Sequence, residues 1–219
     1  MKYKSIKAFG CSCTYGHSLP DCFEKPHFPG LAPSNFAWPA LVAQHMNLPW
    51  INFGICGGSP KQVTYTLMHT PIESDDLVLI LWPQHIRTCF ITDNKVGTPR
   101  HSPDLGEYNF EMQIIGPWVE EKTRFYEQFH YENDAVFNFS IYTQMVYLHL
   151  ASKGVHQIHR YYYYTPQLPF WNTVDLGKFP FDDITAKHDR AADGHHPGLL
   201  AHREFADEFI MQISANGWL

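Results

Sequence analysis

The sequence predicts a three-layer α/β/α fold with a mainly parallel central sheet. Segments with strand and helix patterns alternate along the 219 residues, which is the order of units in a parallel sheet. The strongest strand, Leu77–Leu81, is an unbroken apolar run, as expected of a strand that helices cover on both faces. We therefore expect one domain over residues 1–219, with an irregular insertion at about 83–117.

Four strands are expected, at about Lys4–Phe9, Trp50–Phe53, Leu77–Leu81 and within Val155–Tyr164. The first ends at the turn Gly10–Gly16, and a loop rich in Pro and Gly follows at about His17–Asn35. The second ends at a flexible turn that contains Gly57. Because the carboxyl ends of parallel strands share one edge of the sheet, the turns after the first three strands should meet there.

Four helices are expected, at about Ala37–Met46, Pro60–His69, Val119–Ser152 and Pro197–Asn216. Pro39 is tolerated in the first turn of the first helix, and Ser59 is a plausible N-cap of the second. The third is either one helix or two helices broken near Asn133–Asp134, and Gly154 is a natural stop. The chain before the last helix, through Ala192, has an irregular pattern.

Composition favours a folded protein and excludes some partners. Hydrophobic residues make up 44% and charged residues 17% of the chain, which is ordinary for a globular domain. The net charge is -6 and the basic residues are scattered, so we expect no nucleic-acid partner. Aromatic residues make up 16%, enough to line a groove for sugars or acyl chains, although packing in the core is the simpler use.

The sequence also indicates where the protein works. No apolar run approaches the ~20 residues that span a bilayer, so we expect no membrane span. The first seven residues lack the apolar region of a secretory signal. The five cysteines do not form the dense framework of a small secreted domain. These features together favour the cytoplasm.

Two distant segments contain the parts of a nucleophilic triad. Ser12 lies in the turn after the first strand, and Asp193 precedes His196 by three residues near the end of the chain. A serine needs a base to remove its proton, and the base needs an anion to fix its tautomer. The neighbouring His195 is an alternative base, but the spacing from Asp193 favours His196. Hydrolysis through Ser12, His196 and Asp193 is therefore the leading hypothesis.

These segments resemble the sequence blocks of the SGNH, or GDSL-like, serine hydrolases. The blocks are, in order, Gly10-Cys11-Ser12-Cys13-Thr14-Tyr15-Gly16, Asn52-Phe53-Gly54-Ile55-Cys56-Gly57, Trp82-Pro83-Gln84-His85 and Asp193-Gly194-His195-His196-Pro197. The third differs from the family's Gly-x-Asn-Asp: Gln84 replaces the asparagine, and Trp82 replaces the glycine. The resemblance implies a flavodoxin-like architecture and an ester hydrolase without a cofactor.

The resemblance also implies the roles of several residues. The backbone N–H groups of Ser12 and Gly57, with the side-chain amide of Gln84, would form the oxyanion hole. Trp82 would reshape the pocket and restrict it to short acyl groups. Serine is expected to be the nucleophile in preference to Cys11 or Cys13, which flank it.

Two further interpretations remain open at this point. His85 and Arg87 follow the central strand, where they either bind an anionic or polar group of the substrate or are ordinary surface residues. Zinc is the competing chemistry, through Cys11 and Cys13 with His17 or with the two histidines of the last block. No Cys-x-x-Cys or His-Glu-x-x-His spacing is present, so we expect no metal.

The function expected from the sequence is that of a serine esterase or deacetylase acting on a short-chain acyl ester. The expected partner is a small molecule or a glycan that carries the acyl group, with an acetylated glycan preferred. The alternative is a noncatalytic glycan-binding or structural protein that retains the hydrolase fold. Labelling of Ser12 by a serine-directed phosphonate distinguishes the two.

Overall fold

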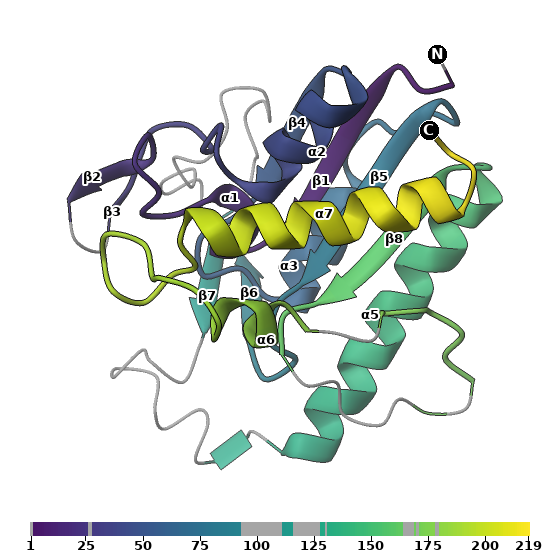
Figure 1. The fold of residues 1–219 in the computed structure, drawn as a ribbon. Helices are drawn as coiled ribbons and strands as arrows, with labels where there is room; N and C mark the ends of the chain where they lie inside the picture. Colours follow the sequence, from purple (N-terminus) through teal and green to yellow (C-terminus); the bar gives the residue numbers. More distant parts are fainter. Residues whose placement is uncertain are drawn as a thin grey trace.

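A parallel sheet of four strands forms the centre of the molecule in the computed structural model (Figure 1). Its strands are β1 Ser5–Gly10, β4 Trp50–Gly54, β5 Asp76–Trp82 and β8 His156–Tyr161, in the order β4-β1-β5-β8. The structure describes residues 2–25, 28–92, 111–115, 128–129, 131–163, 169, 171–177 and 180–219. Every residue of β5 is buried, as the apolar run predicts.

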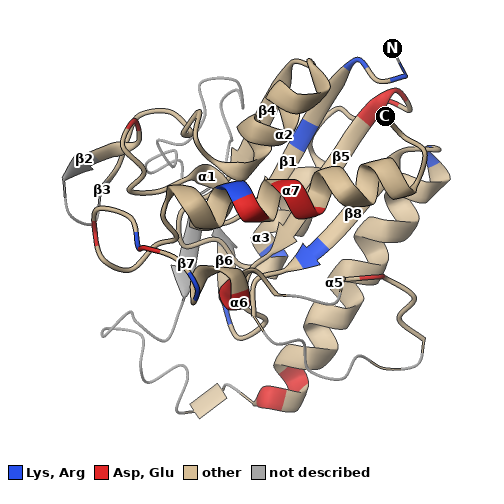
Figure 2. Ribbon diagram, viewed as in Figure 1, with Lys and Arg blue, Asp and Glu red and all other residues tan. Residues whose placement is uncertain are grey.

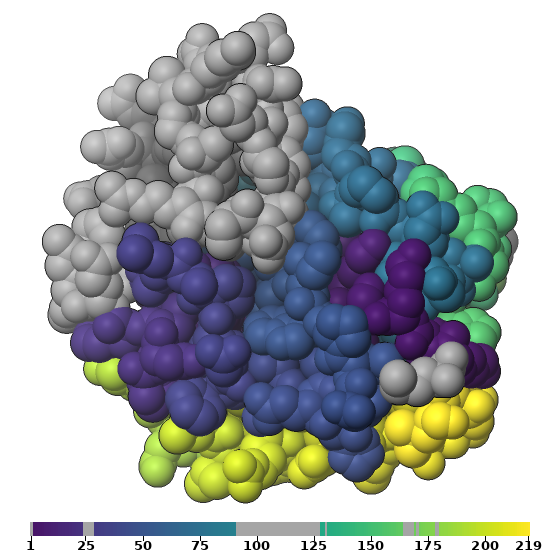
Figure 3. All heavy atoms as spheres, turned by 90° about the horizontal axis from the view of Figure 1, so that it is seen from above, coloured from purple at the N-terminus to yellow at the C-terminus, as the bar shows by residue number. Residues whose placement is uncertain are grey.

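Helices cover both faces of this sheet, which makes the fold a three-layer α/β structure. One face packs against α2 Trp38–Met46, α6 Phe181–Thr185 and α7 Leu199–Ala215, and the other against α3 Pro60–Met68 and α5 Glu132–Ser152. The side chains of β1 alternate accordingly: Ile6 and Ala8 belong to the first core and Phe9 to the second. Seen from above, residues of α7 in yellow lie beside those of α2 in dark blue (Figure 3).

The expected strands are all present, and the helices differ in detail. Ser59 is the N-cap of α3, since its Oγ accepts a hydrogen bond from the Gln62 N–H at 3.2 Å. Residues 128–129 are helical, Tyr131 is extended, and α5 begins after it at Glu132. The expected helical stretch is therefore interrupted at Tyr131, two residues before the break considered at Asn133–Asp134. The earlier part of that expected helical stretch, residues 119–127, lies outside the described residues.

Some segments expected to be irregular contain regular structure. Within 83–117, β6 Thr88–Thr92 pairs antiparallel with β7 Glu111–Ile115, while residues 93–110 and 116–117 lie outside the described residues. The loop at 17–35 contains a short antiparallel pair, β2 Phe23–Lys25 and β3 Phe28–Pro29. The short α6 helix interrupts the irregular stretch before the last helix.

A buried ion pair joins β1 to β5 near the amino ends of the strands. Lys7 Nζ lies 2.7 Å from Asp76 Oδ2, and the Asp76 side chain is fully buried. Asp76 also accepts hydrogen bonds from the Ser5 hydroxyl at 2.6 Å and the Glu73 N–H at 2.9 Å. The Lys7 ammonium also donates to the Pro71 carbonyl oxygen at 2.6 Å, so both charges are well satisfied.

None of the helices in the described part of the chain combines the length and the apolarity that crossing a bilayer demands.

Candidate active site

The turn after β1 places Ser12 at the carboxyl edge of the sheet. Ser12 is the first residue of a short helix, α1 Ser12–Tyr15, and its side chain is largely buried. A Cβ at Gly10 would lie 2.0 Å from Thr14 Oγ1 and 2.7 Å from the Leu81 carbonyl oxygen, so only glycine fits between the end of β1 and β5. The Ile55 N–H donates to the Gly10 carbonyl at 3.1 Å, which joins this turn to the one after β4.

Asp193 and His196 form the pair that their spacing predicts. His196 Nδ1 lies 2.5 Å from Asp193 Oδ2, and the backbone N–H groups of His195 and His196 donate to Oδ1 at 2.9 and 3.0 Å. The Asp193 side chain is 5% exposed, whereas that of His196 is 23% exposed. Burial acts to raise the pKa of Asp193, but the two backbone hydrogen bonds and the His196 ring together lower it well below its usual range.

Ser18 connects this pair to the segment of the nucleophile. Its hydroxyl donates to Asp193 Oδ2 at 2.9 Å, and its carbonyl oxygen accepts a hydrogen bond from the Ala192 N–H at 3.2 Å. Ser18 has a φ of 68°, in the left-handed region that non-glycine residues rarely adopt. This backbone strain persists beside Asp193, where packing and hydrogen bonds hold both segments.

Four of the residues predicted for the site line one hollow of about 370 Å³: Ser12, Gln84, Arg87 and His196. They come from the segments after β1 and β5 and from the loop before α7. Arg87 Nε donates to Gln84 Oε1 at 3.3 Å, which leaves the NH₂ end of that amide available to a substrate oxygen. Within the described residues, no hydrogen bond joins Ser12 Oγ to His196, and such contacts are often long in the absence of substrate.

Gly57 follows β4 at the same edge of the sheet. Its φ of 77° lies in the left-handed region, which explains a glycine at this turn. Among the described residues, Gly57 is not one of those that line the hollow. Its part in an oxyanion hole therefore rests on the resemblance and stays a prediction.

Trp82 lies elsewhere, which corrects the expectation that it shapes the substrate pocket. Trp82 is fully buried on the side of α5, where its Nε1 donates to His159 Nδ1 at 3.0 Å and its ring meets Phe139 edge-on. Alternation along β5 puts this side chain on the face away from α7. His85 lines a second hollow of about 140 Å³, which shares Arg87 with the first, and bonds Tyr161 Oη and Glu132 Oε1 through its two ring nitrogens. A contact between His85 and the substrate stays a prediction.

The two cysteines beside Ser12 are buried thiols. The hydrogen bond from Cys13 lowers the pKa of Cys11, whereas burial raises the pKa of Cys13 well above its usual range. Cys13 is the one that lines the hollow, and a thiol with a raised pKa stays protonated and is a poor nucleophile. This arrangement favours Ser12 as the nucleophile.

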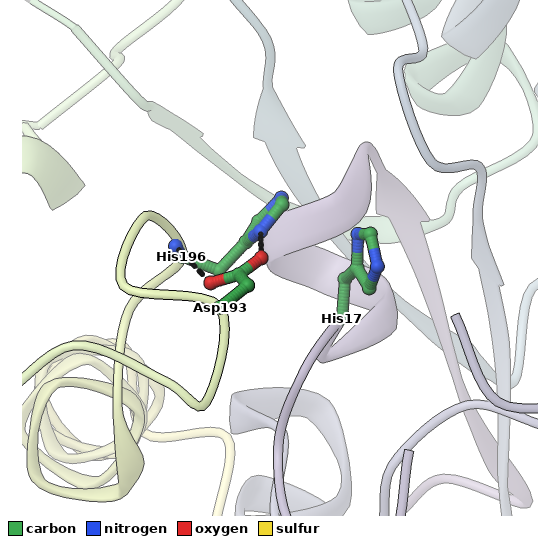
Figure 4. A group of neighbouring side chains, drawn as sticks. All are labelled: His17, Asp193 and His196. Carbon is green, nitrogen blue, oxygen red and sulfur yellow. Dashed lines mark hydrogen bonds and ion pairs between the residues drawn. The ribbon is translucent and has the colours of Figure 1, made fainter. Parts of the chain in front are cut away.

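His17 lies beside the Asp193–His196 pair, as Figure 4 shows. Its ring centroid is 4.4 Å from that of His196, and the two rings are tilted by 47°. His17, Asp193 and His196 offer one ligand atom each, all within 4.8 Å of one another, so this group could hold a metal ion. Two imidazoles and a carboxylate suit zinc and similar ions. The set differs from the one considered in the sequence because it contains no cysteine.

Four residues that the sequence reasoning did not assign to the site also line the hollow: Tyr162, Tyr163, Asp182 and Arg190. Arg190 lies three residues before Asp193, so nearness to the last block was the available signal. Tyr162 and Tyr163 directly follow β8, the fourth strand to end at this edge. No comparable signal marks Asp182 or Ser18, since each reaches the site only through the tertiary fold.

Comparison with known proteins shows the fold. No protein-family model and no curated protein matches the chain. Among solved structures, a catalytic mutant of Axe2, an acetylxylan esterase from Geobacillus stearothermophilus, is 12% identical, with a TM-score of 0.51 over 97% of this chain and 96% of that one. Est2A, an acetyl xylan esterase from Butyrivibrio proteoclasticus, is 11% identical, with a TM-score of 0.53 over 100% of this chain and 65% of that one.

A third structure, LAE5, is an alpha/beta hydrolase enzyme from the metagenome of Lake Arreo, Spain. It is 14% identical to this chain, with a TM-score of 0.50 over 99% of this chain and 96% of that one. At these identities the likeness concerns the fold alone. The chain therefore has the α/β fold of the SGNH-type hydrolases.

Proposed function

We propose that the protein is a serine esterase or deacetylase that cleaves a short-chain acyl ester through Ser12, His196 and Asp193. The observation that carries this proposal is the Asp193–His196 pair at a hollow that Ser12 also lines. The pair is 175 residues or more from Ser18 and Ser12 in the sequence, yet Ser18 bonds it directly. The Asp193 carboxylate is buried and accepts three further hydrogen bonds, which distinguishes the pair from a chance contact between surface residues.

The pairing supports a definite division of labour. Because ionised Asp193 accepts from Nδ1, the neutral His196 ring carries its proton there and keeps Nε2 as the base. His196 takes the Ser12 proton as the hydroxyl oxygen attacks the ester carbonyl, and Asp193 stabilises the imidazolium. The imidazolium then gives the proton to the departing alcohol. Water, activated by the same histidine, releases the acid from the acyl-enzyme.

The negative charge that develops on the carbonyl oxygen needs donors. The backbone N–H groups of Ser12 and Gly57 and the Gln84 amide are the proposed set. The hydrogen bond from Arg87 to Gln84 Oε1 supports this role, because it turns the donor end of the amide away from Arg87. Gln84 thus replaces the family's asparagine with the same amide on a longer stem.

The preference for a short acyl group has a different basis from the one expected. Trp82 does not line the hollow, so it cannot limit the acyl chain directly. The lining instead includes two arginines, a carboxylate and an amide, which disfavour a long apolar chain. Tyr163, which is 42% exposed, offers an aromatic surface to a sugar ring. Two structures of similar fold are acetyl xylan esterases by name, which agrees with an acylated carbohydrate.

The deciding experiment is hydrolysis of p-nitrophenyl acetate by the wild type and by Ser12→Ala and His196→Ala. Both variants should lose the rate, while Ser214→Ala on the exposed side of α7 should keep it. A serine-directed phosphonate should label the wild type and not Ser12→Ala. The noncatalytic alternative is correct if the wild type shows neither turnover nor labelling and if the wild type and Ser12→Ala bind acetylated glycans equally well.

A further inference from the structure

Two arginines line the hollow that contains Ser12 and His196. Arg87 comes from the segment between β5 and β6, and Arg190 comes from the loop between α6 and α7. Among the described lining residues, Asp182 is the one carboxylate. The whole chain is acidic, with 22 acidic and 16 basic residues, and charges of both signs are interspersed along the ribbon in Figure 2. Two guanidinium groups and one carboxylate therefore lie on the described lining of the hollow, in a protein that is acidic as a whole.

The backbone of Arg190 is paired with the segment that contains the proposed base, while its side chain is exposed. It forms an isolated β-bridge with Pro197, and the neighbouring Ala191 N–H donates to the His196 carbonyl at 2.8 Å. Its Nη1 donates to the His195 carbonyl at 3.3 Å. Within the described residues this is the only hydrogen bond from the guanidinium group, which has five N–H donors. The remaining donors can form a two-bond contact with a carboxylate.

Asp182 neutralises Arg190 only in part. No ion pair joins the two within the described residues, although the Arg190 charge acts on Asp182. Burial raises the pKa of Asp182, and Arg190 offsets part of that effect. An arginine without a close carboxylate partner at the wall of a hollow is a suitable site for a negatively charged group of a ligand.

The proposed reaction tells which part of the substrate lies near Arg190. His196 must protonate the oxygen of the departing alcohol, so the alcohol lies on the His196 side of the ester carbonyl. Arg190 and His195 line the same hollow and come from the loop that contains His196. Gln84 and Arg87, by contrast, lie together on the proposed oxyanion side. Because its guanidinium group bonds the His195 carbonyl, next to His196 in the chain, we assign Arg190 to the alcohol side.

We propose that the alcohol part of the substrate carries a carboxylate, as in an acylated acidic sugar, and that Arg190 binds this carboxylate. The inference rests on the proposed ester hydrolysis and deepens it by naming the substrate class. Tyr163 on the same hollow suits the ring of such an alcohol, and Arg87 adds a second positive charge at longer range.

A matched pair of esters tests the proposal. 4-Acetoxybenzoate carries a carboxylate on its leaving phenol, and methyl 4-acetoxybenzoate is its neutral counterpart. The readout is the ratio of kcat/KM for the anionic ester to that for the neutral ester. Arg190→Gln should lower this ratio about tenfold, mainly through KM, because a charge-assisted hydrogen bond is lost. Added salt should reduce the difference. Arg203→Gln, an exposed charge-matched control on α7, should leave the ratio unchanged.

An unchanged ratio in Arg190→Gln overturns the proposal. If the wild type cleaves neither ester, the proposed hydrolysis is in doubt, and binding then decides the question of the carboxylate separately. Calorimetry with inactive Ser12→Ala should show saturable binding of 4-acetoxybenzoate that is weaker in Ser12→Ala/Arg190→Gln. Equal binding by the two proteins, or none by either, contradicts a carboxylate site at Arg190.

Discussion

The backbone N–H and the ring of His196 bond different oxygens of Asp193. The N–H donates to Oδ1 at 3.0 Å, and Nδ1 lies 2.5 Å from Oδ2. The carboxylate is therefore held by the same residue at two points, which fixes its plane relative to the imidazole. With the Ser18 hydroxyl on Oδ2, the geometry is built before any substrate arrives.

Replacing Asp193 with Asn should separate charge from shape. The asparagine oxygen can still accept the backbone hydrogen bonds, but the side chain no longer stabilises the imidazolium or the productive tautomer. We expect kcat for p-nitrophenyl acetate to fall by about 10³–10⁴, with little change in KM. Asp207→Asn, on an exposed position of α7, is the control and should keep full activity. A variant with more than about a tenth of the wild-type rate would contradict the role of Asp193.

Gln84→Ala should remove one oxyanion donor. We expect a loss of about 10²–10³ in kcat with a much smaller change in KM, because the amide acts on charge that develops in the transition state. The measurement is steady-state kinetics with p-nitrophenyl acetate, beside Gln44→Ala on the exposed face of α2. A loss confined to KM would mean that Gln84 binds the ground state and does not complete the oxyanion hole.

Zinc should inhibit the proposed ester hydrolysis without being required for it. Chelation should leave hydrolysis intact, because the proposed chemistry uses only groups of the protein itself and water. Added Zn²⁺ should inhibit by engaging Asp193 and His196 together with His17. His17→Ala should be less sensitive to zinc, with its rate compared to its own zinc-free value. Loss of activity on chelation, restored by metal, would overturn the metal-free mechanism.

Two buried histidines should make stability depend on pH. Burial lowers the pKa of both His159 and His202 to about 3. In the unfolded chain these groups take up protons near pH 6.5. The unfolded state therefore binds more protons between about pH 6.5 and pH 3, and the free energy of unfolding should fall as the pH falls through this range.

Urea unfolding at about pH 7.5 and about pH 5 measures this dependence. The backbone N–H of Trp38 donates a hydrogen bond to His202 Nδ1 at 3.2 Å. His202→Asn keeps an acceptor for this N–H group but removes the titrating imidazole. The variant should therefore show a smaller difference in unfolding free energy between the two conditions. An equal difference would show that other groups govern the effect.

Local patterns predicted the fold where burial dominates. Leu77–Leu81 is a central strand because nothing but apolar side chains fits between two helical layers, and Ser59 caps α3 because its hydroxyl satisfies a free N–H. The β6–β7 pairing joins segments about 20 residues apart, and no local pattern encodes such a contact.

The candidate site was likewise predictable in part: local spacing predicted some of its contacts, and others depend on the tertiary fold. The spacing of Asp193 and His196 predicted their contact, because three residues in one turn bring the two side chains together. The prediction that Trp82 shapes the pocket was wrong. The position of Trp82 along β5, and not its place in a motif, decides which face of the sheet its side chain occupies. Ser18 reaches Asp193 only after two ends of the chain meet, so no local pattern predicted it, whereas His17 was predicted only as a metal ligand beside the cysteines.

The ion pair of Lys7 and Asp76 has a consequence at the opposite end of the sheet. If β1 slipped by one residue against β5, the Lys7 side chain would point to the other face and leave Asp76 charged and unpaired in the interior, which typically costs about 3–5 kcal/mol. The ion pair thus favours a single register between β1 and β5. The alignment of the two strands also determines the relative positions of Ser12 and Gln84, which follow the strand ends. A misalignment that would displace the nucleophile is therefore disfavoured by the cost of an unpaired Asp76.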